Sequence, residues 1–322
     1  FARHRVDIVC VFDGKDVPLE KERERARRRS DSQNIYTKIA ELETLITKIK
    51  KKHGPIEDSQ TIKEVNTILA KQRKIEGYSI INFNKRSTIL WVLNESLSKW
   101  KKQTLFVTEE HIKTTKELCG ILRIPVYQAK GEGETVCACL CLNDKVDAVY
   151  TEDTDVLAYG CPMQLYGFDA KKETVKLVYL KEVLNCLDFN YEQFRDFCIM
   201  LKCDYNDRVP GVGPIKSYNL LYQCDFIEGI LETSPETLSG KSLQTACRAV
   251  QKDYSYLNYE RCRELFSYKK VASVKWRIVK SIDYNAMDDF LKKHRLYTKH
   301  RNAENLLSAK DWQPTPMKFI EF

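Results

Sequence analysis

Acidic residues recur at four places in this chain, each in a short motif whose side chains could take part in chemistry. The motifs are V-F-D-G-K with Asp13, G-E-G-E with Glu132 and Glu134, T-E-D-T-D with Asp153 and Asp155, and K-C-D-Y with Asp204. Carboxylates that converge repel one another unless cations lie between them. Oxygen ligands with no His or Cys pattern beside them favour Mg²⁺ or Mn²⁺. In a basic protein, phosphodiester chemistry is the use of such ions that we expect.

A single D-x-D or E-x-E pair is weak evidence, because solvated acidic loops contain many such pairs. On a continuous helix, residues two positions apart point in different directions, so their convergence needs a loop or a glycine. Each pair here follows a predicted strand or a glycine that begins a helix. Four such sites in order are harder to explain as solvated loops, and we interpret them as one candidate metal site.

A strand–helix alternation positions these carboxylates. Strands are predicted over 6–12, 124–127, 147–150, 163–168 and 175–179, and helices over 109–122, 134–142 and from 191 onward. This alternation predicts an α/β fold with a mostly parallel sheet and flanking helices. Ligands of such sheets gather beyond the carboxyl ends of the strands, which is where Asp13, Asp153 and Asp155 fall.

Between Asp13 and Glu132 the chain has a long segment with helical periodicity. Its apolar positions are Ile35, Ile39, Leu42, Ile46 and Ile49, followed after a Gly-Pro break by Ile62, Val65 and Leu69. Two such stretches predict an antiparallel helical hairpin. Periodicity leaves two interpretations open, namely a coiled-coil arm that packs on itself and a part of an arch over the candidate site.

Two further motifs have basic residues or glycines that suit phosphate binding. The turn V-P-G-V-G-P contains Gly211 and Gly213, whose backbone can approach a phosphate closely, and Lys216 would add a contact. An ordinary helix–helix turn has the same pattern. The run at 21–29 mixes charges at helical spacing, which is typical of a solvated helix face, but its place after the first motif would also let it reach a phosphate.

The composition limits the remaining choices. The chain has 322 residues and a formal net charge of +8, which favours a polyanionic partner. Its twelve cysteines include no C-x-x-C pair, and Cys137, Cys139 and Cys141 lie within an apolar run, so we expect buried free thiols in a reducing compartment. No signal peptide or membrane-spanning run is recognised. We therefore expect no membrane partner and an intracellular location, in the nucleus, the cytoplasm or, for a virus-encoded chain, a viral factory.

Together the motifs resemble those of the flap endonuclease family, which includes the XPG-type structure-specific 5′ nucleases. The resemblance runs from Asp13 to about Tyr222 and, more loosely, over 282–296. It implies a PIN-like nuclease core over 1–190 with a helical arch or insert at about 15–105, a helix-hairpin-helix DNA-binding region over 191–255, and a helical tail over 256–322.

The resemblance also implies roles for particular residues. The metal ligands would be Asp13, Glu132, Glu134, Asp153, Asp155 and Asp204; the catalytic basic residues would be Lys21 and Arg27; the DNA-binding hairpin would contain Gly211, Gly213 and Lys216. The implied cofactors are two Mg²⁺ ions, with Mn²⁺ as a substitute, and a K⁺ ion at the hairpin.

The implied function is metal-dependent cleavage of phosphodiesters in branched, flap-like duplex DNA during replication, repair or recombination. Two alternatives stay open at this point: a PIN-type ribonuclease or exonuclease, and a catalytically weak DNA-binding scaffold.

Some features depart from the family pattern. The family's first strand, with a further aspartate ligand, does not precede V-F-D-G, and the segment over about 33–100 is longer than usual. We therefore expect the remainder of a longer protein or a degenerate copy, with slow catalysis. The lysine of the family's G-P-K is displaced to Lys216. Near the C-terminus, Pro316 occupies the aliphatic position of a sliding-clamp box, so a sliding clamp is not expected as a partner.

Overall fold

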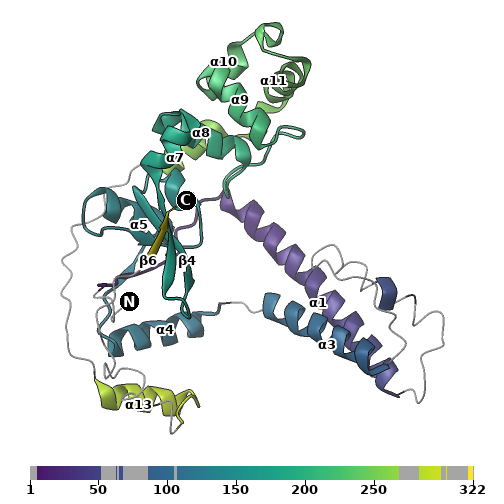
Figure 1. The fold of residues 1–322 in the computed structure, drawn as a ribbon, viewed down its shortest axis with the longest axis vertical. Helices are drawn as coiled ribbons and strands as arrows, with labels where there is room; N and C mark the ends of the chain where they lie inside the picture. The colour runs from purple at the N-terminus through teal and green to yellow at the C-terminus, as the bar shows by residue number, and fades with distance from the viewer. Residues whose placement is uncertain are drawn as a thin grey trace. The chain divides into compact units, whose positions relative to one another are not determined.

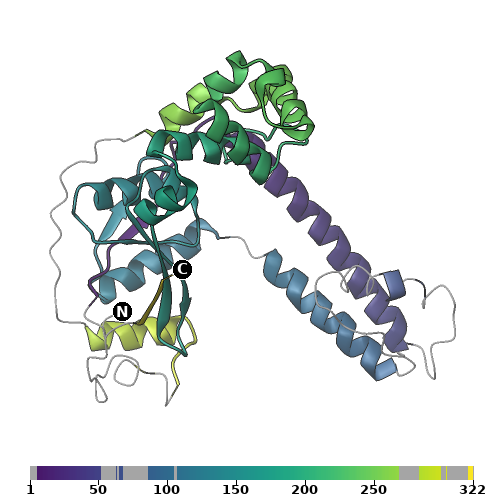
Figure 2. The ribbon, with the colours of Figure 1, turned by 45° about the horizontal axis from the view of Figure 1, so that its top comes forward.

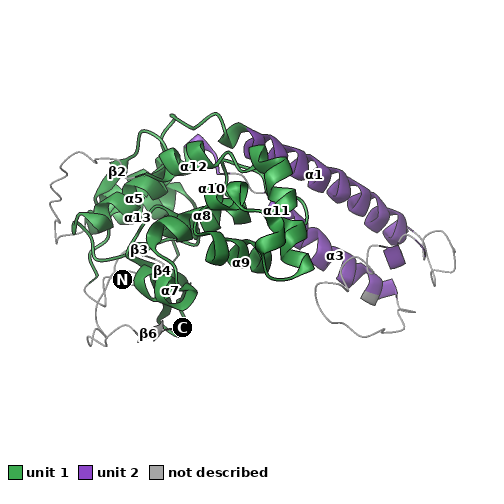
Figure 3. Cartoon of the chain, turned by 90° about the horizontal axis from the view of Figure 1, so that it is seen from above, with its two compact units in different colours: residues 1–22, 110–322 green, residues 23–109 purple. Residues whose placement is uncertain are grey.

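The chain divides into two compact units in the computed structural model, which describes residues 6–51, 63, 65–67, 86–104, 107–267, 283–298, 302 and 318–321. Unit 1 comprises Phe1–Glu22 and Glu110–Phe322, and unit 2 comprises Arg23–Glu109 (Figure 3). The four acidic motifs all belong to unit 1.

Two small sheets lie in unit 1. Their strands are β1 (Cys10–Phe12), β2 (Val126–Gln128), β3 (Val149–Tyr150), β4 (Met163–Asp169), β5 (Thr174–Tyr179) and β6 (Lys318–Glu321). One sheet pairs β1 with β2, and the other has the order β3-β4-β5-β6. Only β4 and β5 pair in antiparallel fashion among the described strands, and the other neighbours are parallel. The predicted α/β class with a mostly parallel arrangement is confirmed.

Two strands are shorter than predicted. The strand expected over 6–12 begins only at Cys10, and the one expected over 147–150 has two residues. A strand extends only as far as a neighbour supplies hydrogen bonds, and β2 pairs with β1 only from Cys10 to Phe12.

Beyond β1 the chain stays close to the segment that follows β2. The Gly14 amide donates to the Gly131 carbonyl at 2.7 Å. A Cβ atom at Gly14 would lie 1.8 Å from the Lys130 carbonyl oxygen, so glycine is required for this approach. The D-G pair of the first motif thereby holds Asp13 next to the loop that leads to Glu132.

Helices make up most of the rest of the described chain outside unit 2. They are α4 (Glu109–Ile121), α5 (Gly133–Leu142), α6 (Asp155–Ala158), α7 (Leu180–Leu187), α8 (Tyr191–Leu201), α9 (Pro214–Cys224), α10 (Ile227–Glu232), η2 (Pro235–Thr237), α11 (Lys241–Asp253), η3 (Tyr254–Tyr256), α12 (Tyr259–Phe266) and α13 (Tyr284–Lys293). The helix predicted over 109–122 is confirmed as α4. Helix α13 lies beside α4 (Figure 1). Met287 and Leu291 of α13 form an apolar cluster with Leu118 and Ile121 of α4.

One apolar core joins α5, α6 and the helices from α8 to α12. All twelve cysteines are free and most are buried, as predicted. A buried charge group reinforces this core: Asp196 on α8 is 0% exposed and binds the guanidinium of Arg263 on α12, with Nε 2.7 Å from Oδ1. Arg263 also donates to Glu228 on α10 at 2.5 Å. Because a buried carboxylate is costly without partners, this network ties the three helices together.

Unit 2 consists largely of α1 (Lys21–Lys51), which begins at the end of unit 1, and α3 (Arg86–Gln103). The two helices lie side by side and run in opposite directions (Figures 1 and 2). Their shared core contains Leu42, Leu45, Ile46, Ile49, Val65, Ile89 and Leu93. The self-packed arm is therefore present, while its use as an arch stays a prediction.

The partner of the first periodic stretch differs from expectation. Helix α3 supplies Ile89 and Leu93 to the core, although within the helical insert predicted at about 15–105 no separate helix was assigned there. Of the stretch that was predicted, Ile62 and Leu69 lie outside the described residues, and Val65 is buried in the same core. A break of several tens of residues hides this pairing from local periodicity.

The separate core of unit 2 can be tested at Leu93, which is 0% exposed. Leu93→Ala should destabilise unit 2 by about 2–5 kcal/mol, because it removes buried methyl groups and leaves a cavity. Hydrogen exchange at the amides of α1 and α3 should speed up, while exchange in β4 and β5 stays unchanged.

Trp91→Ala is the matched control, since Trp91 lies on the same helix and is 62% exposed. It should change exchange little. Equal acceleration throughout the chain in Leu93→Ala would show that the two units unfold as one.

Candidate metal centre

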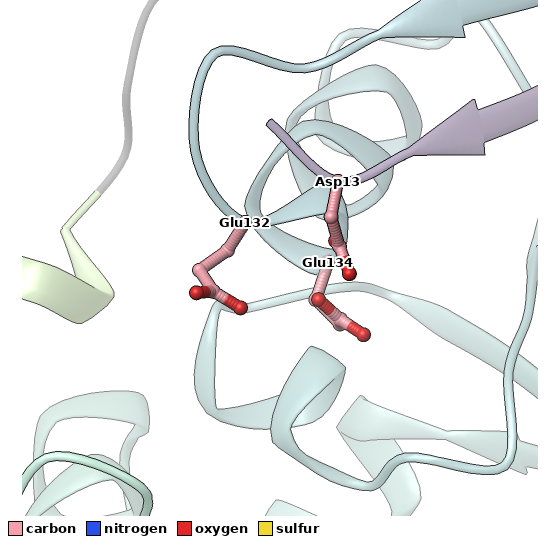
Figure 4. Close-up of side chains that lie close together, drawn as sticks. All are labelled: Asp13, Glu132 and Glu134. Atoms are coloured by element: carbon pink, nitrogen blue, oxygen red, sulfur yellow. The ribbon is translucent and has the colours of Figure 1, made fainter. Parts of the chain in front are cut away.

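Three carboxylates from two motifs meet at the start of α5. Asp13 follows β1, Glu132 is the N-cap residue of α5, and Glu134 lies in its first turn. Oxygen atoms of the three side chains lie within 4.8 Å of one another (Figure 4). The positive end of the helix dipole favours negative charge at this place.

Gly133 explains how two glutamates in one motif can share a site with Asp13. Its amide donates to Asp13 Oδ1 at 2.7 Å. A Cβ atom at Gly133 would lie 2.9 Å from the same oxygen, so any larger residue would displace the carboxylate. Glycine therefore lets the aspartate bind directly to the start of the helix, between the two glutamates.

The T-E-D-T-D motif forms the turn from β3 to α6. The Asp153 amide donates to Thr151 Oγ1 at 3.1 Å, and the Asp155 amide donates to Asp153 Oδ1 at 3.0 Å. Burial, together with the charges of Asp153 and Asp204, raises the pKa of Asp155 to about 7. Asp155 is thus influenced by carboxylates of two motifs that are far apart in the sequence.

Glu134 connects the turn to the start of α5. Burial raises the pKa of the Glu134 carboxyl, and the charges of Asp13, Asp153 and Glu132 add to this effect. All four acidic motifs therefore share one electrostatic environment. The structure brings the oxygens of Asp13, Glu132 and Glu134 together, while Asp153 and Asp155 are related to them through their charges. The assignment of each carboxylate as a metal ligand stays a prediction.

Lys21 is the cation that joins the last motif to the others. Its Nζ atom lies 2.6 Å from Glu132 Oε2 and 3.1 Å from Asp204 Oδ2. Burial alone would lower the pKa of Lys21, but these two ion pairs raise it above its ordinary value. The side chain therefore remains an ammonium ion and neutralises part of the acidic cluster.

Arg27 has local partners instead. Its guanidinium contacts Glu24, one turn before it on α1, at 2.5 Å, and Asp31, one turn after it, at 3.1 Å. Arg27 belongs to unit 2, and a role for it in the site stays a prediction.

Asn206 supports the Asp204 loop and was not predicted from the sequence. Its Oδ1 accepts from the Cys203 amide at 2.8 Å, and its Nδ2 donates to the Ile199 carbonyl at 2.7 Å. These bonds tie the loop to the end of α8. One sequence feature could have predicted this role, namely that an asparagine lies two positions after Asp204. Asparagine stabilises turns through hydrogen bonds to the backbone.

The donor set fits a hard divalent cation. The converging groups are carboxylates, which are the ligands that Mg²⁺ and Mn²⁺ prefer. Cys137 is a neighbour, but burial and the charges of Glu134 and Asp13 raise the pKa of its thiol to about 12.

The glycine turn at 209–214 leads into α9. Gly211 has a φ of 78°, which favours glycine, and its carbonyl accepts from Lys216 Nζ at 2.9 Å. Gly213 has a φ of −102°, and a Cβ atom there would have no neighbour within 4 Å. Contacts within the fold therefore do not require glycine at 213.

The XPG I-region model matches residues 123–204. Flap endonuclease 1 of Brugia malayi is 39% identical over 145 residues, which are 44% of this chain and 38% of that protein. Flap endonuclease 1 of Naegleria gruberi is 30% identical over 217 residues, which are 64% and 52% of the two chains. The solved catalytic core of Rad2 in complex with a DNA substrate has a TM-score of 0.53 at 18% identity, covering 67% of this chain and 71% of that one.

The chain spans about half the length, or less, of the curated relatives that it matches. Among the described residues, no helix is both long and apolar enough to cross a membrane. The matched I-region contains five of the six acidic residues singled out in the sequence, from Glu132 to Asp204. Motif order, the neighbouring carboxylates, the relatives and the shared PIN-like fold agree, and over the matched residues the chain is similar to the XPG-type flap endonucleases.

Proposed function

We propose that this chain is the nuclease part of a Mg²⁺-dependent, structure-specific 5′ nuclease that cleaves branched, flap-like DNA. The observation that carries the proposal is the cluster of Asp13, Glu132 and Glu134, which Lys21 links to Asp204 through its ion pairs with Glu132 and Asp204. The charges of Asp153 and Asp204 act on Asp155 beside it. The proposed modules are a core over 1–190 with its insert at about 15–105, a helix-hairpin-helix region over 191–255 and a helical tail over 256–322.

The proposed metal ligands are Asp13, Glu132, Glu134, Asp153, Asp155 and Asp204. Two bound Mg²⁺ ions, or Mn²⁺ in their place, would supply Lewis acidity for hydrolysis of the phosphodiester. The raised pKa values of Glu134 and Asp155 mean that cation binding competes with protons at these two carboxyls. Lys21, which stays charged, would offset the charge of the scissile phosphate, with Arg27 as a second cation.

The glycine turn is the proposed contact to duplex DNA. Backbone amides near Gly211 and Gly213 would donate to phosphate oxygens, Lys216 would add charge, and a K⁺ ion would bind at the same turn. Phosphate contacts position a duplex without reading its bases. Selection among substrates would then follow the shape of the DNA rather than its sequence.

The deciding experiment for this function is cleavage of a labelled substrate panel with Mg²⁺. The panel contains a 5′ flap, a 3′ flap, a bubble, a four-way junction and single-stranded RNA. Cleavage of the 5′ flap near the branch is expected. Cleavage of the RNA alone would favour a ribonuclease, and duplex binding without any cleavage would favour a scaffold.

Asp155→Ala should reduce cleavage by more than roughly 100-fold, because ligand loss removes several kcal/mol of charge stabilisation in the transition state. Duplex binding, measured by fluorescence anisotropy, should stay near the wild-type value. Asp169→Ala is the control, since Asp169 is a half-buried carboxylate at the end of β4 that accepts from the Lys171 amide at 2.9 Å. Wild-type cleavage by Asp155→Ala would exclude Asp155 as a ligand.

The pKa of Asp155 also predicts how stability without metal depends on pH. Its folded value of about 7 exceeds the ordinary value of 3.8, so the folded state binds more protons between these values. Stability from this group is therefore lost as the pH rises through that window. Asp155→Asn should match the wild type near pH 4 and be more stable by roughly 1–3 kcal/mol at pH 8 in EDTA.

Urea unfolding at several pH values measures this difference. Saturating Mg²⁺ at pH 8 should narrow or reverse it, because the ion stabilises the folded wild type by binding to it. A stability difference that is constant from pH 4 to pH 8 would mean that Asp155 titrates normally.

Gly213→Val tests the glycine turn. A Cβ atom at this position has open space and φ is ordinary, so the fold should be kept, and the loss of a glycine N-cap should lower the stability by about 1 kcal/mol or less. Duplex binding should weaken, and the slope of log affinity against log salt should shrink by about one for each lost phosphate contact. Gly120→Val is the control, because a Cβ atom at Gly120 on α4 also meets nothing within 4 Å. Equal weakening by both variants would refute the role of the turn.

A further inference from the structure

A buried glutamine lies behind the turn that contains Asp153 and Asp155. Gln164, on β4, is 2% exposed and belongs to the small set of buried polar side chains. Its Nε2 atom donates to the Thr151 carbonyl and to the Asp153 carbonyl, both at 3.0 Å. Both hydrogens of one amide nitrogen are thus used on the same turn.

The position of Gln164 follows from the register of the sheet. Val149 on β3 lies opposite Gln164, and the Thr151 amide donates to the Leu165 carbonyl at 3.0 Å, one residue beyond the end of β3. After Thr151 the backbone turns away and the ladder ends. The Gln164 side chain supplies donors to the next carbonyls and replaces the hydrogen bonds that the strand no longer makes.

The choice of residue type is informative. A polar amide at a buried position costs free energy unless its hydrogen bonds are made, and an aliphatic side chain would pack there without this cost. Among uncharged side chains, only the amides of Asn and Gln offer two donors on one nitrogen, and Gln has the longer reach. Gln164 is therefore suited to binding two carbonyls that lie on either side of Glu152.

We infer that Gln164 is a positioning residue for the metal centre, which sets the geometry of Asp153 and Asp155 through the backbone of their turn. It touches neither carboxylate. By holding the Thr151 and Asp153 carbonyls, it fixes the conformation in which Asp153 Oδ1 accepts from the Asp155 amide at 3.0 Å. The inference rests on the proposed function, because positioning matters only if these carboxylates bind a cation.

The turn needs such support because its own bonds are few. Asp153 is exposed, and the Asp153 and Asp155 amides donate to Thr151 Oγ1 and Asp153 Oδ1. Glu152 Oε1 adds two bonds, accepting from the Tyr150 hydroxyl at 2.9 Å and from the Gly167 amide at 3.0 Å. Each such hydrogen bond contributes about 0.5–1.5 kcal/mol. Two further bonds from a buried group are comparable in strength to the bonds of the turn itself, and they come from a rigid strand.

The test uses Gln164→Met, which keeps an unbranched side chain of similar length but has no donor. Isothermal titration calorimetry with Mn²⁺ alone should show roughly 10–100-fold weaker binding, the usual loss when a supporting group of a metal ligand is removed. Hydrogen exchange at the Asp153 and Asp155 amides should be faster. Gln164→Glu, which turns an acceptor toward the two carbonyls, should lose at least as much.

Gln251→Met is the matched control. Gln251 on α11 also donates from one amide nitrogen to several carbonyls at the end of α10, namely Ile230 at 2.9 Å, Thr233 at 2.7 Å and Leu231 at 3.4 Å. Its loss should lower the melting temperature without changing Mn²⁺ affinity. This control separates a general loss of stability from a specific effect on the metal centre.

Two results would overturn the inference. One is that both Gln164 variants bind Mn²⁺ as tightly as the wild type. The other is that Gln251→Met weakens Mn²⁺ binding equally, which would show that the effect reflects a general loss of stability. A wild-type protein that binds no Mn²⁺ would refute the proposed function, and the inference would fall with it. The wild-type titration therefore distinguishes the two failures.

Discussion

Repulsion among carboxylates is the constraint on which the architecture of unit 1 depends. Folding brings acidic groups from four segments into one place, and burial together with their neighbours raises the pKa values of Glu134 and Asp155. Each raised pKa records free energy that the folded state loses by holding these groups together. The rest of the unit must supply that free energy, through the apolar core and through the Arg263 network that joins α8, α10 and α12.

Local backbone features then determine where each charge lies. Gly14 and Gly133 permit approaches that a Cβ atom would block, and the start of α5 offers a backbone donor to Asp13. Gln164 and Asn206 act in the same way for the other two motifs, since each binds backbone groups of a loop that contains acidic residues. The four motifs thus share a design in which a neutral polar group or a glycine holds the backbone while the carboxylates remain available.

The sequence was most informative where acidic motifs lie next to glycines and other residues that mark the ends of strands and helices. The acidic motifs, the α/β class and helix α4 could be predicted because glycines, apolar runs and spacing are local signals. Helix α3 as the partner of α1 could not, because the residues that pair are tens of positions apart. Nor could Gln164 be found, since a glutamine within a strand has no distinct pattern until the register with β3 shows which carbonyls it faces. The predicted length of the first strand was wrong for the same reason. The run over 6–12 is apolar enough to form a strand, but only Cys10–Phe12 has a neighbouring strand to pair with.

Lys21 adds a coupling that the carboxylates alone would not have. One ammonium is shared by Glu132 and Asp204, two groups proposed as metal ligands, and the same ammonium is proposed to face the phosphate. An oxygen that binds a cation gives up part of its attraction for Lys21, because the two positive charges compete for one acceptor. The lysine is then drawn toward the next anion within reach, which in the proposed function is the substrate. Cation binding and phosphate binding would therefore strengthen each other through the partners of a single side chain, with no change in the fold.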